Sequence, residues 1–201
     1  MRILGIDPGL RLTGYGCIDA LGENASLVEA GVFRLGRAEP GADARSVSSR
    51  LAELDTDLRA VLTRLKPDLV AVESLFAHYK HPATAIVMGH ARGVVLLAIA
   101  QADIRLVEFK PNEVKKSLTG HGHADKARMQ RAIQARFSLP RPPSPPDVAD
   151  AIAIALCAAG RRGSLLARVE VAVQLEGGRG ALRRRGRISS NELRRAAGGP
   201  P

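Results

Sequence analysis

The chain has 201 residues, of which 45% are hydrophobic and 25% are charged, so a disordered chain is excluded. The longest apolar run, Gly93–Ala100, is too short to cross a bilayer, which excludes a membrane-spanning protein. The net charge of +10 favours an anionic partner such as nucleic acid but does not establish one. No charged, apolar and cleavable leader opens the chain, so we expect a cytoplasmic protein.

The first half of the chain favours strands, followed by one helix and one further strand. Arg2–Asp7, Thr13–Ala20 and Ala25–Leu35 are β-capable runs separated by Gly, Pro and Asn, which predicts an antiparallel meander. Apolar residues then recur every three or four positions over Val47–Leu65, which is typical of one face of a helix. Asp68–Ser74 is the next predicted strand.

The second half alternates helices with a single strand. The predicted helix Thr84–Gln101 carries small and apolar residues almost all round. It should therefore be buried on more than one side, by the core, by a partner subunit or by both. Ile104–Phe109 is a predicted strand. The remaining predicted helices are Asn112–Leu118, Ala124–Phe137 and Asp147–Arg161.

This order of elements predicts an α/β domain over residues 1–165, with a mixed five-stranded sheet and helices on both faces. The end of the chain differs in composition. Residues 161–201 contain ten arginines and three glutamates, which is most of the excess positive charge. We therefore expect 166–201 to be a mobile, basic Gly/Arg-rich tail that is attracted to polyanions, or else a tail that only adds solubility.

Acidic residues stand at the ends of two predicted strands and at the start of the last helix. Asp7 and Glu73 end their strands, and Asp147 and Asp150 share one face of the first helical turns. Each acid alone has an ordinary interpretation, as a strand-end charge or a helix cap. Together they would meet at the carboxyl edge of the sheet, where open α/β sheets place their active sites.

Four carboxylates without a basic neighbour repel one another unless a cation neutralises them. Hard oxygen ligands of this kind suit Mg²⁺ or Mn²⁺. Two such ions a few ångströms apart can activate a water and stabilise the leaving oxygen of a phosphodiester. The acids therefore predict a metal-dependent reaction on a phosphodiester.

Four segments in unbroken order between Met1 and Arg162 resemble the RuvC family of Holliday junction resolvases, in the ribonuclease H-like superfamily. They are GIDPGLRLTGYG, ESLFAHYKHPATAIVMGHARGVVL, EFKPNEVKKSLTGHGHADKARMQ and DVADAIAIA. The resemblance implies a ribonuclease H-like fold and a homodimer that makes paired, Mg²⁺-dependent nicks across a four-way DNA junction in recombination and repair. It also implies 5′-phosphate ends and partnership with a branch-migration helicase.

The resemblance further assigns Asp7, Glu73, Asp147 and Asp150 as catalytic ligands of two Mg²⁺ ions, which Mn²⁺ could replace. Histidine can stand in for the first acid of the helical pair in this family, which leaves open whether Asp147 or only Asp150 is a ligand. The resemblance covers the chain as far as Arg162 and does not extend to the basic tail.

Several other residues are candidates for DNA contact. Phe76 and Tyr79 follow Glu73 closely, and aromatic faces beside a nuclease centre can stack on an unpaired base; alternatively, Phe76 seals the core. The resemblance assigns Phe76 to junction contact.

Lys115 and Lys126 lie on the two short predicted helices and match DNA-contacting lysines of the family. Between them, Gly120 and Gly122 would let the backbone approach a phosphate.

Two other functions remain open at this point. An ATPase of the actin and sugar-kinase type also opens with a strand, an aspartate and a glycine-bearing turn, but it needs a second phosphate loop and roughly twice this length. A non-catalytic junction-binding protein could use the same basic surface. The four acids argue against that binder, because uncompensated carboxylates repel phosphate.

Overall fold

The computed structural model describes residues 1–22, 24–36, 46–74 and 82–161, and within these ranges five strands form one mixed sheet. They are β1 (Arg2–Asp7), β2 (Leu12–Leu21), β3 (Asn24–Arg34), β4 (Leu69–Glu73) and β5 (Arg105–Phe109). The strand order is β3-β2-β1-β4-β5, with β1, β2 and β3 antiparallel and β1, β4 and β5 parallel. The predicted meander and mixed sheet are confirmed.

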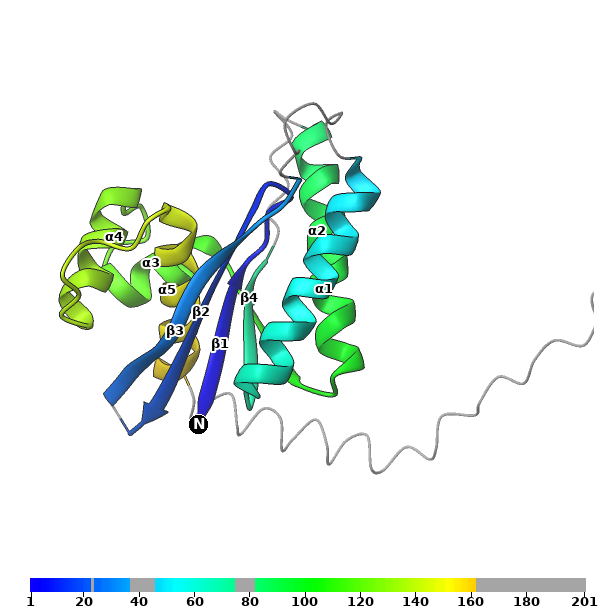
Figure 1. Ribbon diagram of the computed structural model, residues 1–201. Coiled ribbons are helices and arrows are strands. Elements are labelled where there is room, and N and C mark those ends of the chain that lie inside the picture. The colour runs from blue at the N-terminus through cyan, green and yellow to red at the C-terminus, as the bar shows by residue number, and fades with distance from the viewer. Residues whose placement is uncertain (23, 37–45, 75–81, 162–201) are drawn as a thin grey trace, which may run out of the picture. The chain divides into compact units, whose positions relative to one another are not determined.

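Helices cover both faces of this sheet, as predicted (Figure 1). They are α1 (Val47–Leu65), α2 (Pro82–Gln101), α3 (Pro111–Thr119), α4 (Lys126–Arg136) and α5 (Pro146–Gly160). One face carries α1 and α2, and the other carries α5 with α3 and α4 beyond it (Figure 1). None of the helices in the described ranges has the length and apolarity needed to cross a membrane.

The core on the α1 side follows from the spacing of its apolar residues. Leu54, Leu58 and Leu62 are buried on one stripe of α1, in one cluster with Leu4 and Ile6 of β1. Ser46 caps the start of the helix, because its hydroxyl accepts a hydrogen bond from the Ser49 backbone N–H at 3.2 Å. At the other end, Lys66 adopts the left-handed conformation and closes the last turn.

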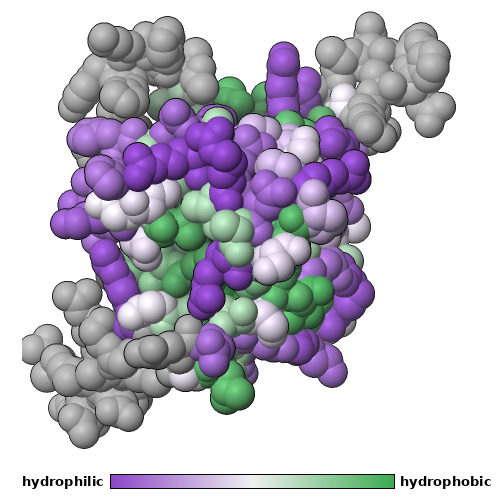
Figure 2. Space-filling model, turned by 90° about the vertical axis from the view of Figure 1, so that its left-hand side faces the viewer, coloured by the Kyte–Doolittle hydropathy of each residue, from purple (hydrophilic) through white to green (hydrophobic). Residues whose placement is uncertain are grey.

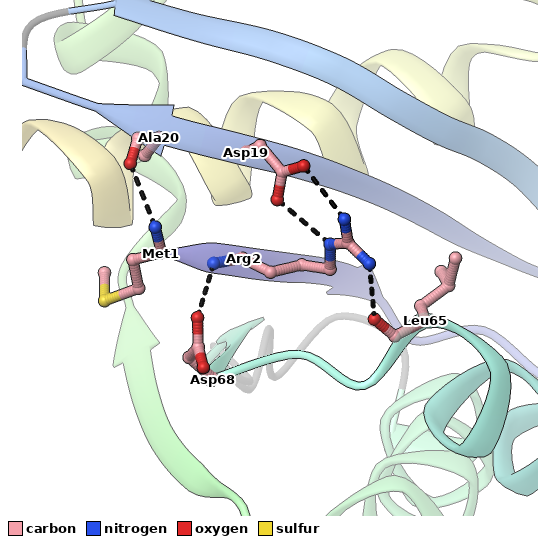
Figure 3. Close-up of polar contacts among 6 residues, drawn as sticks. All are labelled: Met1, Arg2, Asp19, Ala20, Leu65 and Asp68. Atoms are coloured by element: carbon pink, nitrogen blue, oxygen red, sulfur yellow. Dashed lines mark hydrogen bonds and ion pairs between the residues drawn. The ribbon is translucent and has the colours of Figure 1, made fainter.

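Arg2 links the start of β1 to the carboxyl ends of β2 and α1 and to the residue before β4 (Figure 3). Its guanidinium donates two hydrogen bonds of 2.9 Å to Asp19 of β2 and one of 3.0 Å to the Leu65 carbonyl at the end of α1. Its backbone N–H donates to Asp68, just before β4, at 2.6 Å. These bonds hold the end of the sheet that lies opposite the acids.

The helices α5 and α2 differ in how far the described chain covers them. The run Ala151–Ala155 of α5 is buried on every side. In α2, Ala91 and Val95 are buried, whereas Ile86 is 60% exposed and Leu97 is 54% exposed. The prediction that α2 is covered on more than one side is therefore not met by the described residues of a single copy.

Candidate active site

The first two acids lie side by side at the carboxyl ends of neighbouring parallel strands. Ile6 of β1 is paired with Val72 of β4, so the next residues along, Asp7 and Glu73, end the two strands together. Residues two apart in a strand point to the same face. Gly5 faces α5, so Asp7 points toward α5 as well.

The other two acids reach this edge because α5 packs unusually close to the sheet. A Cβ added to Gly14 would lie 2.1 Å from the Asp147 carbonyl oxygen, and one added to Gly5 would lie 2.1 Å from that of Ala151. Gly14 is also the register partner of Asp7. Glycine in β1 and β2 therefore permits the close approach that brings the first turn of α5 to the end of β1.

Burial and mutual repulsion raise the pKa values of the carboxylates. Burial raises the pKa of Asp7 to about 8, and the neighbouring charges of Glu73, Asp150 and Asp147 contribute to the rise. Burial, followed by the charge of Asp150, raises the pKa of Glu73 to about 7. The pKa of Asp150 is raised as well, first by burial and then by Asp147. The structure thus brings all four predicted acids into one electrostatic group.

Two lysines stand near the acids, as predicted. Lys126 begins α4 and lowers the pKa of both Asp7 and Asp150. Lys115 of α3 does the same for Glu73 and Asp150. Both effects are smaller than the effect of burial, so the lysines offset the negative charge only in part. Their contact with DNA stays a prediction.

The two glycines that follow α3, Gly120 and Gly122, differ in backbone conformation and in contacts. Gly120 ends α3 in the left-handed conformation, with φ of 75°, and its N–H donates to the Lys116 carbonyl. This helix-ending role accounts for glycine at that position. A Cβ on Gly122 would lie 3.4 Å from the Asn112 carbonyl, which is ordinary contact. Phe76, Tyr79 and the tail 166–201 lie outside the described residues.

A cleft of about 650 Å³ opens beside two of the acids. Its lining residues are Asp7, Pro8, Gly9, Leu10, Arg11, Leu12, Arg50, Val87, Met88, Lys126 and Asp147. The cleft thus joins α1 and α2 on one face of the sheet to α4 and α5 on the other. Arg11, Arg50 and Met88 were not predicted for this site. Arg11 follows Asp7 by four residues, whereas Arg50 and Met88 come from α1 and α2, which only the folded chain brings to the acids.

The surface on the α3 and α4 side is largely polar. Figure 2 looks onto that side, where hydrophilic residues surround a smaller area of exposed hydrophobic surface. Lys116, Arg128 and Arg131 are among the exposed basic residues of the two helices. This basic surface adjoins the acidic edge through Lys126.

The chemistry of the acid group fits a divalent cation. Its donors are carboxylate oxygens, whose pKa values at Asp7 and Glu73 are raised first by burial and then by the neighbouring carboxylates. As the side chains stand, no three His, Cys, Asp or Glu residues of the described ranges form a group that could hold a metal ion. To share an ion, these carboxylates would have to turn closer together.

The sheet order, the helices on both faces and the acids at the carboxyl edge define a ribonuclease H-like protein with a candidate nuclease centre. A family model described as crossover junction endodeoxyribonuclease RuvC matches residues 3–158. The chain therefore belongs to the RuvC family.

Similar proteins agree with this assignment. A RuvC crossover junction endodeoxyribonuclease from Rhodopirellula baltica is 45% identical over 155 residues, covering 77% of this chain and 84% of that protein. The structure of Thermus thermophilus RuvC matches with a TM-score of 0.69 and 32% identity, covering 82% of this chain and 96% of that chain. T. thermophilus RuvC in complex with Holliday junction substrate matches with the same TM-score, 28% identity and the same coverage.

Family membership confirms the predicted enzyme class, a crossover junction endodeoxyribonuclease. It also confirms the ribonuclease H-like fold class. Nucleases of this family are metal-dependent. The ATPase and the non-catalytic binding protein are therefore set aside.

Proposed function

We propose that two copies of this chain bind one four-way DNA junction and nick two opposed strands in a Mg²⁺-dependent reaction that leaves 5′-phosphate ends. The similarity to T. thermophilus RuvC in complex with a Holliday junction supports the substrate. The observation that carries the proposal is the electrostatic group formed by four acids at one sheet edge. Such junctions arise in recombination and repair.

In this proposal Asp7, Glu73 and Asp150, together with Asp147, hold two Mg²⁺ ions, which Mn²⁺ could replace. When bound, the ions supply activation of the attacking water and stabilisation of the departing oxygen. To hold the ions, the acids would have to be ionised, and the pKa of about 8 at Asp7 would make ion binding depend on pH. Burial around Asp7 keeps bulk water from screening these charges.

The basic residues around the acids orient the DNA strand. Lys115 and Lys126 bind backbone phosphates beside the acids, which positions the strand without reading its sequence. Gly120 and Gly122 let a further phosphate approach the backbone between α3 and α4. Outside the described residues, we assign Phe76 and Tyr79 to stacking on an unpaired base at the junction.

The exposed apolar side of α2 supports pairing of two copies. Ile86 and Leu97 are more than half exposed in a single copy. A Cβ added at Gly89 or Gly93 would touch no atom of the described residues within 4 Å. A two-fold dimer through this side would match the two-fold symmetry of a junction, so each centre would cut one of two opposed strands.

The remaining assignments concern the surroundings of the enzyme. We assign residues 1–165 to the nuclease domain and 166–201 to a mobile basic tail that is attracted to the DNA backbone. We also propose a cytoplasmic location and cooperation with a branch-migration helicase. Pull-down of the full chain with such a helicase in the presence of junction DNA tests the partnership.

Cleavage of a synthetic four-way junction tests the proposed function. With Mg²⁺, the full chain should nick two opposed strands of the junction and leave a linear duplex of the same sequence uncut. Asp7→Asn should bind the junction but cut it slower by about three orders of magnitude or more. Uncut junction in Mg²⁺ and in Mn²⁺, or normal cutting by Asp7→Asn, would contradict the proposal.

A further inference from the structure

Arg50 is a charged residue of the cleft that has no partner in the described chain. It lies in the first turn of α1, and its side chain lines the same cleft as Asp7 and Asp147. Its Nε atom is buried and has no hydrogen-bond partner among the described residues. A buried donor without an acceptor costs free energy, so this position of Arg50 beside the cleft does not serve the stability of the fold.

Glycine at position 36 leaves space for the Arg50 side chain. Gly36, just after β3, has φ of 70°, and a Cβ there would lie 2.6 Å from the Arg50 Nε and 3.1 Å from its Cδ. The Gly36 N–H donates a 2.8 Å hydrogen bond to Glu53, one turn along α1 from Arg50. Gly36 is therefore held against α1, and any other residue at that position would displace the guanidinium.

The acids do not use Arg50 as their counter-charge. The cations that lower the carboxyl pKa values of Asp7 and Asp150 are Lys126 and Lys115, which belong to the opposite face of the sheet. The cleft thus has a lysine on the α4 side, carboxylates at the sheet edge and an arginine on the α1 side. A DNA strand carries one phosphate per nucleotide, so a strand crossing this edge would present phosphates to both basic sides.

We propose that Arg50 binds a backbone phosphate of the strand being cut, on the α1 side of the acids and across them from Lys126. This inference rests on the proposed function and adds a substrate-binding residue to it. The planar guanidinium suits the task, because its donors match two oxygens of one phosphate. With Lys126 on the other side, Arg50 would hold the strand at two points and so fix the scissile phosphate between them.

Three variants of the full chain test the inference. Arg50→Met removes the charge and the buried donor but keeps an apolar stem, and Arg50→Lys restores the charge. Arg59→Met is the matched control: it removes the same charge from a partly exposed position of α1 outside the cleft, where Arg59 pairs with Asp55 at 2.8 Å. The probe is a synthetic four-way junction in EDTA, with binding measured over a range of NaCl concentrations.

Arg50→Met should weaken junction binding by roughly 10- to 100-fold, because a hydrogen bond to a charged group is lost. It should also reduce the slope of log Kd against log salt by about one, which is the sign of one lost phosphate contact. Arg50→Lys should restore the slope, and Arg59→Met should leave it unchanged. The melting temperature of Arg50→Met should be equal to or above that of the wild type, because the unpaired buried donor is gone.

Two results would overturn the inference. One is a salt slope for Arg50→Met equal to that of Arg59→Met and the wild type. The other is a lower melting temperature with unchanged junction affinity, which would mean that Arg50 only supports the fold. Both require wild-type protein that binds and cuts the junction. A wild-type chain that does neither would instead contradict the proposed function.

Discussion

The helices α5 and α2 are both apolar almost all round, yet the fold uses them in opposite ways. Against α5, the sheet presents glycine, and the run Ala151–Ala155 is wholly enclosed. Against α2, the described chain covers Ala91 and Val95 but leaves Ile86 and Leu97 exposed. Apolar composition thus predicts that a helix must be covered, but it does not say whether the same chain or a second copy provides the cover.

The space around glycine differs between the two sides in the same way. In β2, the space next to Gly14 is filled by the backbone of α5, 2.1 Å from where a Cβ would lie. In α2, none of the described residues of a single copy fills the space next to Gly89 and Gly93. Glycine inside a helix costs about 1 kcal/mol relative to alanine, so these two positions are consistent with close approach by a second copy. We assign the α5 side to the active site and the α2 side to pairing of two copies.

The largest effect should come from filling the space under α5. Gly14→Ala places a methyl group where the Asp147 carbonyl lies, so the start of α5 must move and carry Asp147 and Asp150 away from Asp7. We expect junction cleavage per folded molecule to fall by about 100-fold, and unfolding free energy to fall by about 2–4 kcal/mol. Single-turnover cleavage and urea unfolding measure the two effects.

Gly160→Ala is the control for this substitution. Gly160 belongs to the same helix, but a Cβ there would meet no atom within 4 Å in the part of the chain that the structure describes. It should leave cleavage and stability near the wild-type values. Equal cleavage and stability of Gly14→Ala and Gly160→Ala would contradict the idea that close packing of α5 against the sheet positions Asp147 and Asp150.

The second prediction tests whether two copies pair through the exposed side of α2. The double variant Ile86→Lys and Leu97→Lys places charge on the exposed side of α2, so pairing of two copies should weaken by about 100-fold or more. Sedimentation velocity over a range of protein concentrations measures the change. Leu21→Lys, at a residue that is 82% exposed at the end of β2, is the control and should leave assembly unchanged. Equal assembly of both variants would place the dimer contact elsewhere.

A smaller effect is expected on the free energy of unfolding in the absence of metal, through Asp7. The folded pKa of Asp7 is about 8, above its ordinary value of 3.8, so the folded state binds the extra proton between these values. Stability from this group is present at low pH and is lost as pH rises toward 8. Asp7→Asn in EDTA should therefore be more stable than the wild type by about 1–3 kcal/mol near pH 8.

That gain should shrink to nothing near pH 4, where the wild-type carboxyl is also neutral. Thermal unfolding at several pH values follows the difference between the two proteins. A constant difference across the range, or a loss of stability at pH 8, would contradict the raised pKa of Asp7.

Local patterns in the sequence were enough to predict most of the fold. The apolar spacing over Val47–Leu65 matches α1 at both ends, because that helix buries one regular stripe. The other helices were placed within two residues of their observed ends, and α2 and α5 begin earlier than predicted, at Pro82 and Pro146. Proline is well tolerated in the first helical turn, where its missing N–H is not needed.

The acids could be predicted because each stands at the end of an element whose position in an α/β sheet is regular. Arg50 and Met88 could not, since α1 and α2 meet the acidic edge only through the tertiary fold. Nothing in the local sequence around Arg50 distinguishes it from the other arginines of α1. The reason for Gly5 and Gly14 is likewise visible only once α5 is in place.

The central claim is that the four acids act as one binding site for divalent cations, and Mg²⁺-dependent thermal stability tests it most directly. At 100-fold excess of Mg²⁺ over Kd, the wild type should gain about 2.7 kcal/mol. Asp7→Asn should lose most of that gain, whereas Asp57→Asn, at an exposed position of α1, should keep it. A wild-type protein whose melting temperature does not respond to Mg²⁺ or Mn²⁺, or an Asp7→Asn variant that responds equally, would contradict the account.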